Sequence, residues 1–425
     1  MEAGVLVLAL NSVEVVVLLL VVTLAVALAA RGLRVPYTLA LVVVGLVLGM
    51  SGLLPRVRLD PVVVLFVFLP LLLFEGAWSM RLAQLLAEWA PVALLALPGL
   101  LISIVVTALV VRAGIGLAWP VALLLGAMVS PTDPVAVLAL LRQLDLPERL
   151  RALVEGESLF NDGLGAAAFT MLLALAVAAG AGQPAASPWS VALGALWLML
   201  GGVAIGTALG LVAALALRAI DDYLIETMAT VCVAYGAYVL ADLAHASGLL
   251  AVICAGFVMG NYGRRTAMSA RTRAVTEDVW EVAGYLANSL LFLLLGVQIG
   301  AHGLLPALAG IAWAVLGVLM GRAAMIYVLL PLYNVVTARW PGRGRWARRR
   351  IPRAWGPLLL FSGLRGALSL ALVLSLPASL AARPLLESIV YGVVLVTLVG
   401  QGIGLRIVLP LWAARGDQPA PPAPR

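Results

Sequence analysis

The sequence predicts an all-α membrane protein that crosses the bilayer about thirteen times. Composition is the first reason, since 64% of its 425 residues are hydrophobic and only 11% are charged. A soluble domain is typically about 25% charged and about half apolar, so this much apolar surface needs lipid to cover it. The second reason is length, because apolar runs of about 20 residues, enough to span a bilayer core of about 30 Å, follow one another along the chain.

The expected spans are joined by short polar connections. They run near 11–30, 36–54, 59–77, 89–112, 117–142, 148–179, 189–218, 224–243, 246–261, 272–298, 303–336, 353–377 and 384–411. Residues 1–416 are therefore expected to form one transmembrane domain. The tail at 417–425 is rich in proline and alanine, and we expect it to be short, cytoplasmic and disordered.

Arginine placement tests this count and orients the chain. All 27 basic residues are arginines; twenty lie on the side that follows odd-numbered spans and four on the opposite side. Short cytoplasmic loops are enriched in basic residues, which predicts an outside N-terminus and a cytoplasmic C-terminus in the inner (plasma) membrane. In this setting the positive net charge reflects topology, and no nucleic-acid partner is expected.

The fifth span is interrupted by an acid between two prolines. Residues 130–134 read Ser-Pro-Thr-Asp-Pro. Because proline removes helical hydrogen bonds, Pro131 and Pro134 free backbone carbonyls beside Asp133. Such a break is tolerated at membrane depth only where it is buried or lines a cavity. Carbonyls and a carboxylate can replace the water shell of a monovalent cation; a proline kink with a capping Asp is the alternative.

The sixth span carries two polar faces. Ser158 and Asp162 are four residues apart on one face of a helix, and Glu157 and Asn161 share a neighbouring face. Helical rise from the nearest cytoplasmic arginine places Asp162 roughly 16 Å and Asp133 roughly 13 Å into the membrane. Two carboxylates at matching depth on adjacent spans are expected to face one ion site rather than to form a purely structural pair.

Other ionisable residues also lie inside the expected spans, where charges are costly and point to function. Arg365 stands between glycines in the twelfth span, roughly 18 Å deep on the same measure, and we expect Glu157 to be its anionic partner. Glu75 lies below the midplane in the third span, either as a water-mediated helper of the site or as an interfacial charge. Arg322 in the eleventh span is expected to pair helices.

The two interrupted spans occupy equivalent places in the chain. Spans one to six and eight to thirteen can be taken as two repeats with the seventh as a linker, which inverts the second copy in the membrane. Inverted repeats whose broken helices meet at the midplane are the architecture of secondary transporters. The predicted fold is therefore two inverted six-helix repeats, with discontinuous fifth and twelfth helices that cross at the midplane.

Four motifs, in order along nearly the whole chain, resemble the sodium/proton exchanger branch of the monovalent cation:proton antiporters, and in particular its prokaryotic NhaP-type members. The motifs are Phe-Glu-Gly-Ala-Trp at 74–78, Ser-Pro-Thr-Asp-Pro at 130–134, Glu-Ser-Leu-Phe-Asn-Asp-Gly at 157–163 and Gly-Leu-Arg-Gly-Ala-Leu-Ser at 363–369. The resemblance implies a secondary active transporter rather than an enzyme, with no cofactor. Its cargo would be H⁺ and Na⁺ or Li⁺, and its role pH homeostasis.

The resemblance also implies a ligand set. Asp133, Ser158 and Asp162 are expected to bind Na⁺, with a main-chain contribution from Thr132 and a water-mediated one from Glu75. Around them, Asn161 is similar to the Asn of the family's Asn-Asp pair, and Glu157 with Arg365 is similar to its buried ion pair. Members are usually homodimers, which implies an interface bundle of roughly 11–77 and 189–298 and a moving core bundle of roughly 89–179 and 303–411.

Competition between protons and cations for the same carboxylates, with alternating access, would give obligatory exchange. A K⁺/H⁺ or mixed-cation antiporter of the same fold remains an alternative. An intramembrane protease is a remote one, since His245 and His302 lie at outer ends of helices and no GxGD signature is present. The chain has no Lys, and a guanidinium does not give up its proton. We therefore expect electroneutral exchange of one Na⁺ for one H⁺.

Overall fold

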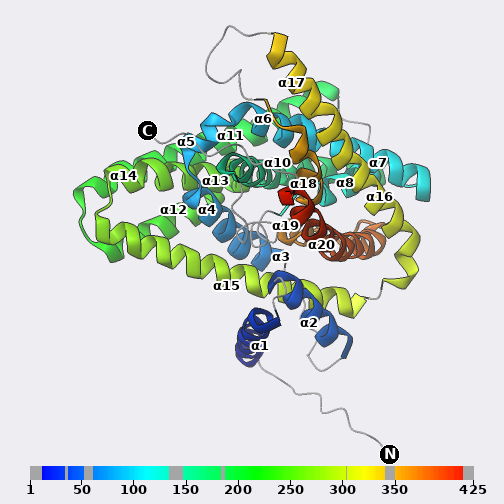
Figure 1. Cartoon of the computed structure of the whole chain (residues 1–425), viewed down its shortest axis with the longest axis horizontal. Coiled ribbons are helices and arrows are strands. Elements are labelled where there is room, and N and C mark those ends of the chain that lie inside the picture. The colour runs from blue at the N-terminus through cyan, green and yellow to red at the C-terminus, as the bar shows by residue number, and fades with distance from the viewer. Residues whose placement is uncertain are drawn as a thin grey trace, which may run out of the picture.

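A computed structural model describes residues 12–33, 37–51, 61–133, 147–182, 187–302, 304–339 and 350–414. Over these residues every element of regular secondary structure is a helix, and there is no strand (Figure 1). In the same ranges, nine helices are long and apolar enough to cross a membrane, and two shorter apolar helices accompany them. The predicted all-α polytopic fold is confirmed.

Within the described residues, each predicted span contains a helix or a series of helical pieces. The pieces are α1 (Ser12–Leu33), α2 (Tyr37–Ser51), α3 (Pro61–Val63), α4 (Leu69–Ser79), α5 (Leu82–Ala87), α6 (Trp89–Leu94), α7 (Leu100–Ile115), α8 (Trp119–Val129), α10 (Glu148–Gly180), α11 (Pro188–Ala216), α12 (Tyr223–Leu243), α13 (Gly248–Val258), α14 (Arg264–Thr266), α15 (Ala270–His302), α16 (Leu308–Ala324), α17 (Leu330–Arg339), α18 (Gly356–Phe361), α19 (Ala367–Leu374) and α20 (Arg383–Ala414). The second half of the fifth span and the tail at 417–425 lie outside the described residues.

Local sequence explains where several helices begin and end. Ser187 accepts a hydrogen bond from the Ser190 backbone N–H at 3.1 Å and so caps α11. Asp222 accepts from Leu224 N–H at 2.9 Å at the start of α12. α7 ends at Gly116, whose φ of 70° favours glycine. Each device satisfies or terminates backbone groups that a helix end leaves open.

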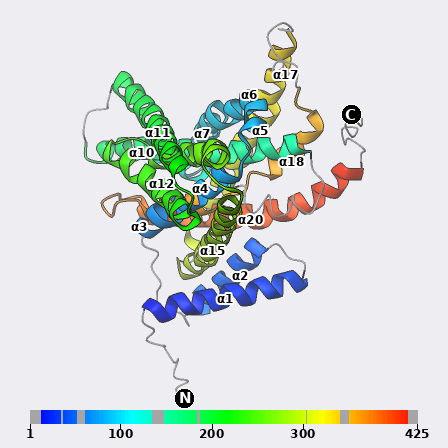
Figure 2. The ribbon, with the colours of Figure 1, turned by 90° about the vertical axis from the view of Figure 1, so that its left-hand side faces the viewer.

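Glycines set the closest helix packing. On α2, a Cβ at Gly45 would lie 2.1 Å from the carbonyl oxygen of Leu293, and on α15 a Cβ at Gly296 would lie 2.2 Å from that of Val42. Gly49 and Gly300 repeat this approach one turn on, so both helices carry a GxxxG pattern. Small residues at this spacing let two membrane helices approach backbone to backbone. α2 therefore lies directly along α15, with α1 on its other side (Figure 2).

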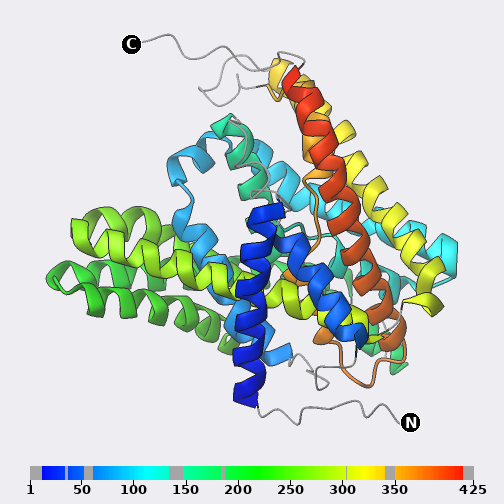
Figure 3. The same ribbon diagram turned by 60° about the horizontal axis from the view of Figure 1, so that its bottom comes forward.

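The helices form two groups around α10. α11, α12 and α13 pack on one another and lie at one end of the molecule with part of α15, whereas α7, α16 and α20 pack together at the other end (Figures 1 and 3). The second span of each half packs on the third span of the other half: α2 packs on α15, and α13 packs on α4. An inverted repeat produces such reciprocal contacts; the repeat itself stays a prediction.

Candidate ion-binding site

Two helix breaks meet inside the protein. α8 ends at Val129, and the chain then runs without helix through residues 130–133; between α18 and α19 it is likewise unwound over residues 363–366. The two stretches are joined by a hydrogen bond from the Asp133 N–H to the Leu364 carbonyl at 2.8 Å. A Cβ at Gly366 would lie 1.9 Å from Asp133 Oδ2, so only glycine leaves room for this carboxylate. The predicted interruptions of the fifth and twelfth spans are therefore observed, and they contact each other; the continuation of the fifth span after residue 133 lies outside the described residues, so the crossing of two discontinuous helices stays a prediction.

The described part of the fifth span also touches α10. The hydroxyl of Thr132 lies 2.9 Å from that of Ser158, and both side chains are buried. One turn further along α10, Asp162 lines the same cavity as Thr132 and Asp133, and the two carboxylates interact electrostatically. The four side chains singled out on these segments therefore lie around one point, with Ser158 behind Thr132 rather than on the cavity wall.

A cavity of about 820 Å³ opens onto this point. Its walls carry six carboxylates and, among the described residues, no arginine. The acids come from α4, the α8 break, α10 and α15, and they are Glu75, Asp133, Glu155, Asp162, Glu277 and Glu281. Such a wall attracts cations and repels anions, because low-dielectric surroundings focus the field of like charges.

The cavity runs from the helix crossing toward the arginine-rich side of the protein. It includes Ser79 and Met80 at the end of α4, next to Arg81, and Glu277 near the beginning of α15. Glu75 lies along this cavity between the helix breaks and the end of α4. Its carboxylate faces Gly284 of α15, where an added Cβ would lie 3.4 Å from Oε2 of Glu75. Glu75 therefore lies on the wall of the cavity, and its role there stays a prediction.

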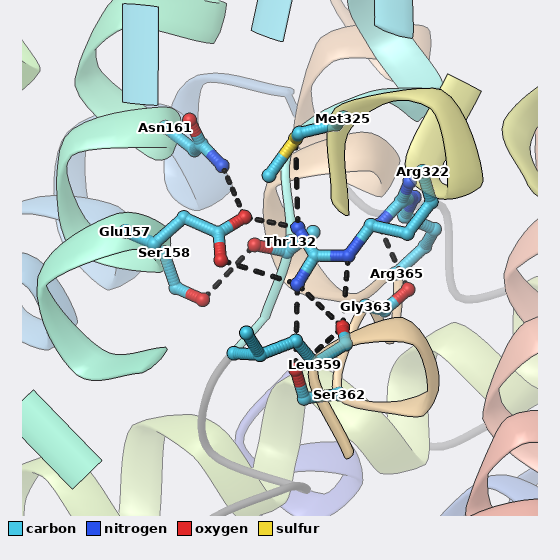
Figure 4. Close-up of polar contacts among 10 residues, drawn as sticks. All are labelled: Thr132, Glu157, Ser158, Asn161, Arg322, Met325, Leu359, Ser362, Gly363 and Arg365. Atoms are coloured by element: carbon cyan, nitrogen blue, oxygen red, sulfur yellow. Dashed lines mark hydrogen bonds and ion pairs between the residues drawn. The ribbon is translucent and has the colours of Figure 1, made fainter. Parts of the chain in front are cut away.

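The ion pair at Glu157 is not the predicted one. Arg322 of α16 forms the pair, with Nη1 toward Oε1 and Nη2 3.1 Å from Oε2 of Glu157 (Figure 4). Asn161 donates from Nδ2 to the same carboxylate at 3.3 Å. Arg365, which is 1% exposed, instead donates from Nη1 to the Gly363 carbonyl at 2.7 Å. The prediction that Arg365 is the partner of Glu157 was wrong.

The helix break explains the exchange of partners. α18 ends at Phe361, so the Leu359 carbonyl loses the helical N–H that would otherwise reach it. Arg322 donates to this carbonyl from Nε at 3.0 Å and from Nη2 at 2.8 Å while it holds Glu157. The Arg322 guanidinium thus both caps the end of α18 and neutralises Glu157. Arg365 lies within the unwound stretch and bonds to the backbone of that stretch.

Sequence reasoning missed part of the site. Glu277 and Glu281 are four residues apart and share one face of α15, a spacing that could have indicated them, but acids near a helix end are common on solvated surfaces. Glu155 and Leu159 also line the cavity. They precede Asp162 by seven and three residues, so the three side chains lie along one face of α10. That face extends over two turns, and the sequence motif indicated only its end at Asp162.

Comparison with known proteins gives both a family and a fold. The family model described as "Sodium/hydrogen exchanger, transmembrane" matches residues 16–410. The chain is 36% identical over 385 residues to the Na⁺/H⁺ antiporter ApNhaP of Aphanothece halophytica, covering 91% of this chain and 71% of the relative. It is 35% identical to the Na⁺/H⁺ antiporter NhaP of Pseudomonas aeruginosa, over 80% and 78% of the two chains.

A solved structure shares the architecture. The sodium proton antiporter MjNhaP1 from Methanocaldococcus jannaschii superposes with a TM-score of 0.71, at 18% identity, over 93% of this chain and 97% of its own. At this level of identity the likeness concerns the fold.

Proposed function

The chain belongs to the sodium/hydrogen exchanger family, and on that premise we propose that it is a secondary active antiporter that exchanges Na⁺ for H⁺ at Asp133 and Asp162. The observation that carries the proposal is the meeting of these two carboxylates, from the α8 break and from α10, at the inner end of one acidic cavity. Hard cations prefer oxygen ligands, and two carboxylates with hydroxyl and carbonyl oxygens supply them.

Exchange follows from competition at this point. Protonation removes the negative charge that holds the cation, and cation binding stabilises the charged form that protonation would remove. Asp162 and Asp133 line the same cavity, and in the proposed mechanism they bind protons as a pair rather than one by one. When the site faces each side of the membrane in turn, a cation bound on one side leaves on the other in exchange for a proton. No ATP and no covalent step is needed.

The neighbouring residues support the site in different ways. In the proposed Na⁺ complex, Ser158 supplies a hydroxyl ligand, Thr132 a main-chain carbonyl and Glu75 a water-mediated contact. The Ser158 hydroxyl is already within hydrogen-bond distance of Thr132, so a small rotation would turn it toward a cation between the two helices. The Glu157–Arg322 pair connects α10, α16 and the end of α18. These contacts would fix the position of Asp162 relative to the helix breaks.

The proposed ratio of Na⁺ to H⁺ follows from the basic residues beside the site, which are two arginines and no lysine. The only basic groups beside the site in the described chain are Arg322 and Arg365, both almost fully buried, and a guanidinium keeps its proton at physiological pH. The proton-carrying groups are then the carboxylates alone. One Na⁺ would exchange for one H⁺ without net charge movement.

We further propose that the arginine-rich face is cytoplasmic, so that the cavity in this structure opens inward. On the same basis the protein would work as a homodimer in the plasma membrane. Residues of roughly 11–77 and 189–298 would supply the interface bundle, and residues of roughly 89–179 and 303–411 the moving core bundle. The glycine-lined seam between α2 and α15 would then stiffen the interface bundle.

The experiment that tests the proposed activity is exchange by purified protein in proteoliposomes. An outward proton gradient is read with a trapped pH dye, and Na⁺, Li⁺ and K⁺ are added in turn. We expect Na⁺ and Li⁺ to dissipate the gradient at saturable rates. A response to K⁺ equal to that to Na⁺ would replace the proposed ion, and no response to any cation would refute antiport.

A further inference from the structure

A second, smaller pocket lies beside the mouth of the acidic cavity. Its volume is about 260 Å³, and it shares Trp78, Ser79 and Met80 with the larger cavity. Where the larger cavity gathers acids, this pocket gathers arginines: Arg81 at the start of α5, Arg264 and Arg265 of α14, and Arg273 of α15. The side chains come from three segments far apart in sequence and converge on one hollow.

The wall of this pocket is a defined structure rather than a loose loop. Asn261 accepts a hydrogen bond from the Leu82 N–H at 2.8 Å and donates to the Met80 carbonyl at 3.1 Å. A Cβ at Gly260 would lie 2.3 Å from the Trp78 carbonyl oxygen, so the chain after α13 is pressed against the end of α4. The bend that carries Arg81 is thus held in place by the neighbouring turn.

The positive charges in the pocket are poorly compensated. Within the described chain, the one carboxylate in an ion pair with any of the four arginines is Glu277, whose Oε2 lies 2.5 Å from Nη2 of Arg264. Four guanidinium groups thus face one acid. Like charges gathered in a small hollow with a protein wall repel one another unless an anion joins them. Arginine forks match the oxygens of a phosphate group in particular.

We propose that this pocket binds a phosphate group, from free phosphate or from a phospholipid headgroup, and that the bound anion raises the affinity of the neighbouring cavity for Na⁺. Arg264 is the link, since it lines the arginine pocket and pairs with Glu277, which lines the acidic cavity. A phosphate in the pocket competes for Arg264 and so leaves the Glu277 carboxylate to attract cations at the mouth. The binding site is independent of the proposed antiport; only the effect on Na⁺ rests on it.

Binding is tested without transport. Protein in neutral detergent is titrated calorimetrically with inorganic phosphate and, separately, with micelles of short-chain phosphatidylglycerol; phosphatidylcholine micelles serve as the blank. We expect saturable binding that weakens at least tenfold in the Arg265→Gln, Arg273→Gln double variant. The matched control is Arg271→Gln, because Arg271 lies on α15 over the Tyr223 ring and outside the pocket, and it should bind as the wild type does.

The two arms identify the source of the phosphate. Binding of phosphatidylglycerol alone assigns a lipid headgroup, and binding of inorganic phosphate assigns the free ion. If neither binds the wild type, or if the double variant binds as tightly as the wild type, the proposed site is wrong.

The coupling is tested in proteoliposomes with the ligand that binds. The apparent KM for Na⁺ should fall severalfold on ligand addition in the wild type. In Glu277→Gln the ligand should still bind calorimetrically, but the KM should no longer move. A wild-type KM that ignores the bound ligand would overturn the link between the pockets, even where exchange itself is normal.

Discussion

Two acids of α10, five residues apart and on different faces of the helix, have opposite surroundings. Glu157 is 1% exposed; it forms an ion pair with Arg322 and accepts a hydrogen bond from Asn161. Asp162 faces a cavity, and no hydrogen bond or ion pair reaches its side chain from the residues that the structure describes. In the proposed mechanism the Glu157 carboxylate, paired with a guanidinium, has a structural role, whereas the Asp162 carboxylate binds cations and protons in turn.

The comparison predicts that removing the charge of the cavity-facing acid abolishes exchange while the fold survives. Asp162→Asn keeps the shape of the side chain but cannot carry a proton, so Na⁺-driven proton flux in proteoliposomes should fall to the background of empty vesicles. Its thermal unfolding in detergent should stay close to that of the wild type. The control is Glu281→Gln, the same change on the wall of the same cavity, which should keep most of the flux.

The locked acid predicts the reverse pattern, with stability affected first. Arg322→Gln leaves Glu157 buried and without its ion-pair partner, and it leaves the Leu359 carbonyl with the Ser362 hydroxyl at 2.9 Å as its remaining donor. Breaking one half of a buried ion pair typically costs about 3–5 kcal/mol. We expect a large drop in the unfolding temperature and in yield. Arg365→Gln is the matched comparison: Arg365 bonds to a backbone carbonyl and to no described acid, so it should lose less.

A double variant separates pairing from position. Combining Glu157→Gln with Arg322→Gln removes both charges, and part of the lost stability should return. A double variant whose loss equals the sum of the two single losses would show that the two residues are not energetically coupled.

A smaller effect is expected at the hydroxyl beside the site. Ser158→Ala removes one neutral oxygen and the contact with Thr132, and such an interaction is worth about 1 kcal/mol. The apparent KM for Na⁺ should rise roughly fivefold, with the maximal rate little changed. Ser158→Thr, which restores a hydroxyl, should recover affinity; equal KM values for the Ala variant and the wild type would remove Ser158 from the ligand set.

The last prediction is that the membrane potential has no effect on exchange. If exchange is electroneutral, a membrane potential should leave it unchanged, whereas each unbalanced charge would feel about 2.3 kcal/mol per 100 mV. The measurement imposes potassium–valinomycin potentials of both signs on proteoliposomes during exchange driven by a Na⁺ gradient. A shift of the end point with the sign of the potential would contradict 1:1 exchange and leave antiport itself intact.

Local signals in the sequence predicted most of the fold. Span positions follow from apolar run length, and the breaks before Pro134 and around Arg365 follow from proline and glycine, because both act on the backbone where they stand. The meeting of Asp133 with α10 was predictable because adjacent spans are antiparallel and depth can be counted along each helix.

The partner of Glu157 was not predictable in this way. Two arginines, Arg322 and Arg365, lie in spans of the second half, and depth alone does not say how each helix is rotated. Arg322 also donates to the Leu359 carbonyl, which lacks its helical N–H partner only because α18 ends at Phe361 in the folded structure. Glu277 was missed for a similar reason, because the packing of α15 decides whether it faces solvent or the cavity.

The central claim, that Na⁺ and H⁺ compete for the Asp133–Asp162 pair, is tested most directly by proton release. Purified protein in weakly buffered detergent solution is mixed with NaCl, and the released protons are measured against a choline chloride blank. We predict saturable release approaching one proton per Na⁺ bound in the wild type, and none from Asp162→Asn. Release of undiminished size from the folded Asp162→Asn variant would contradict the claim.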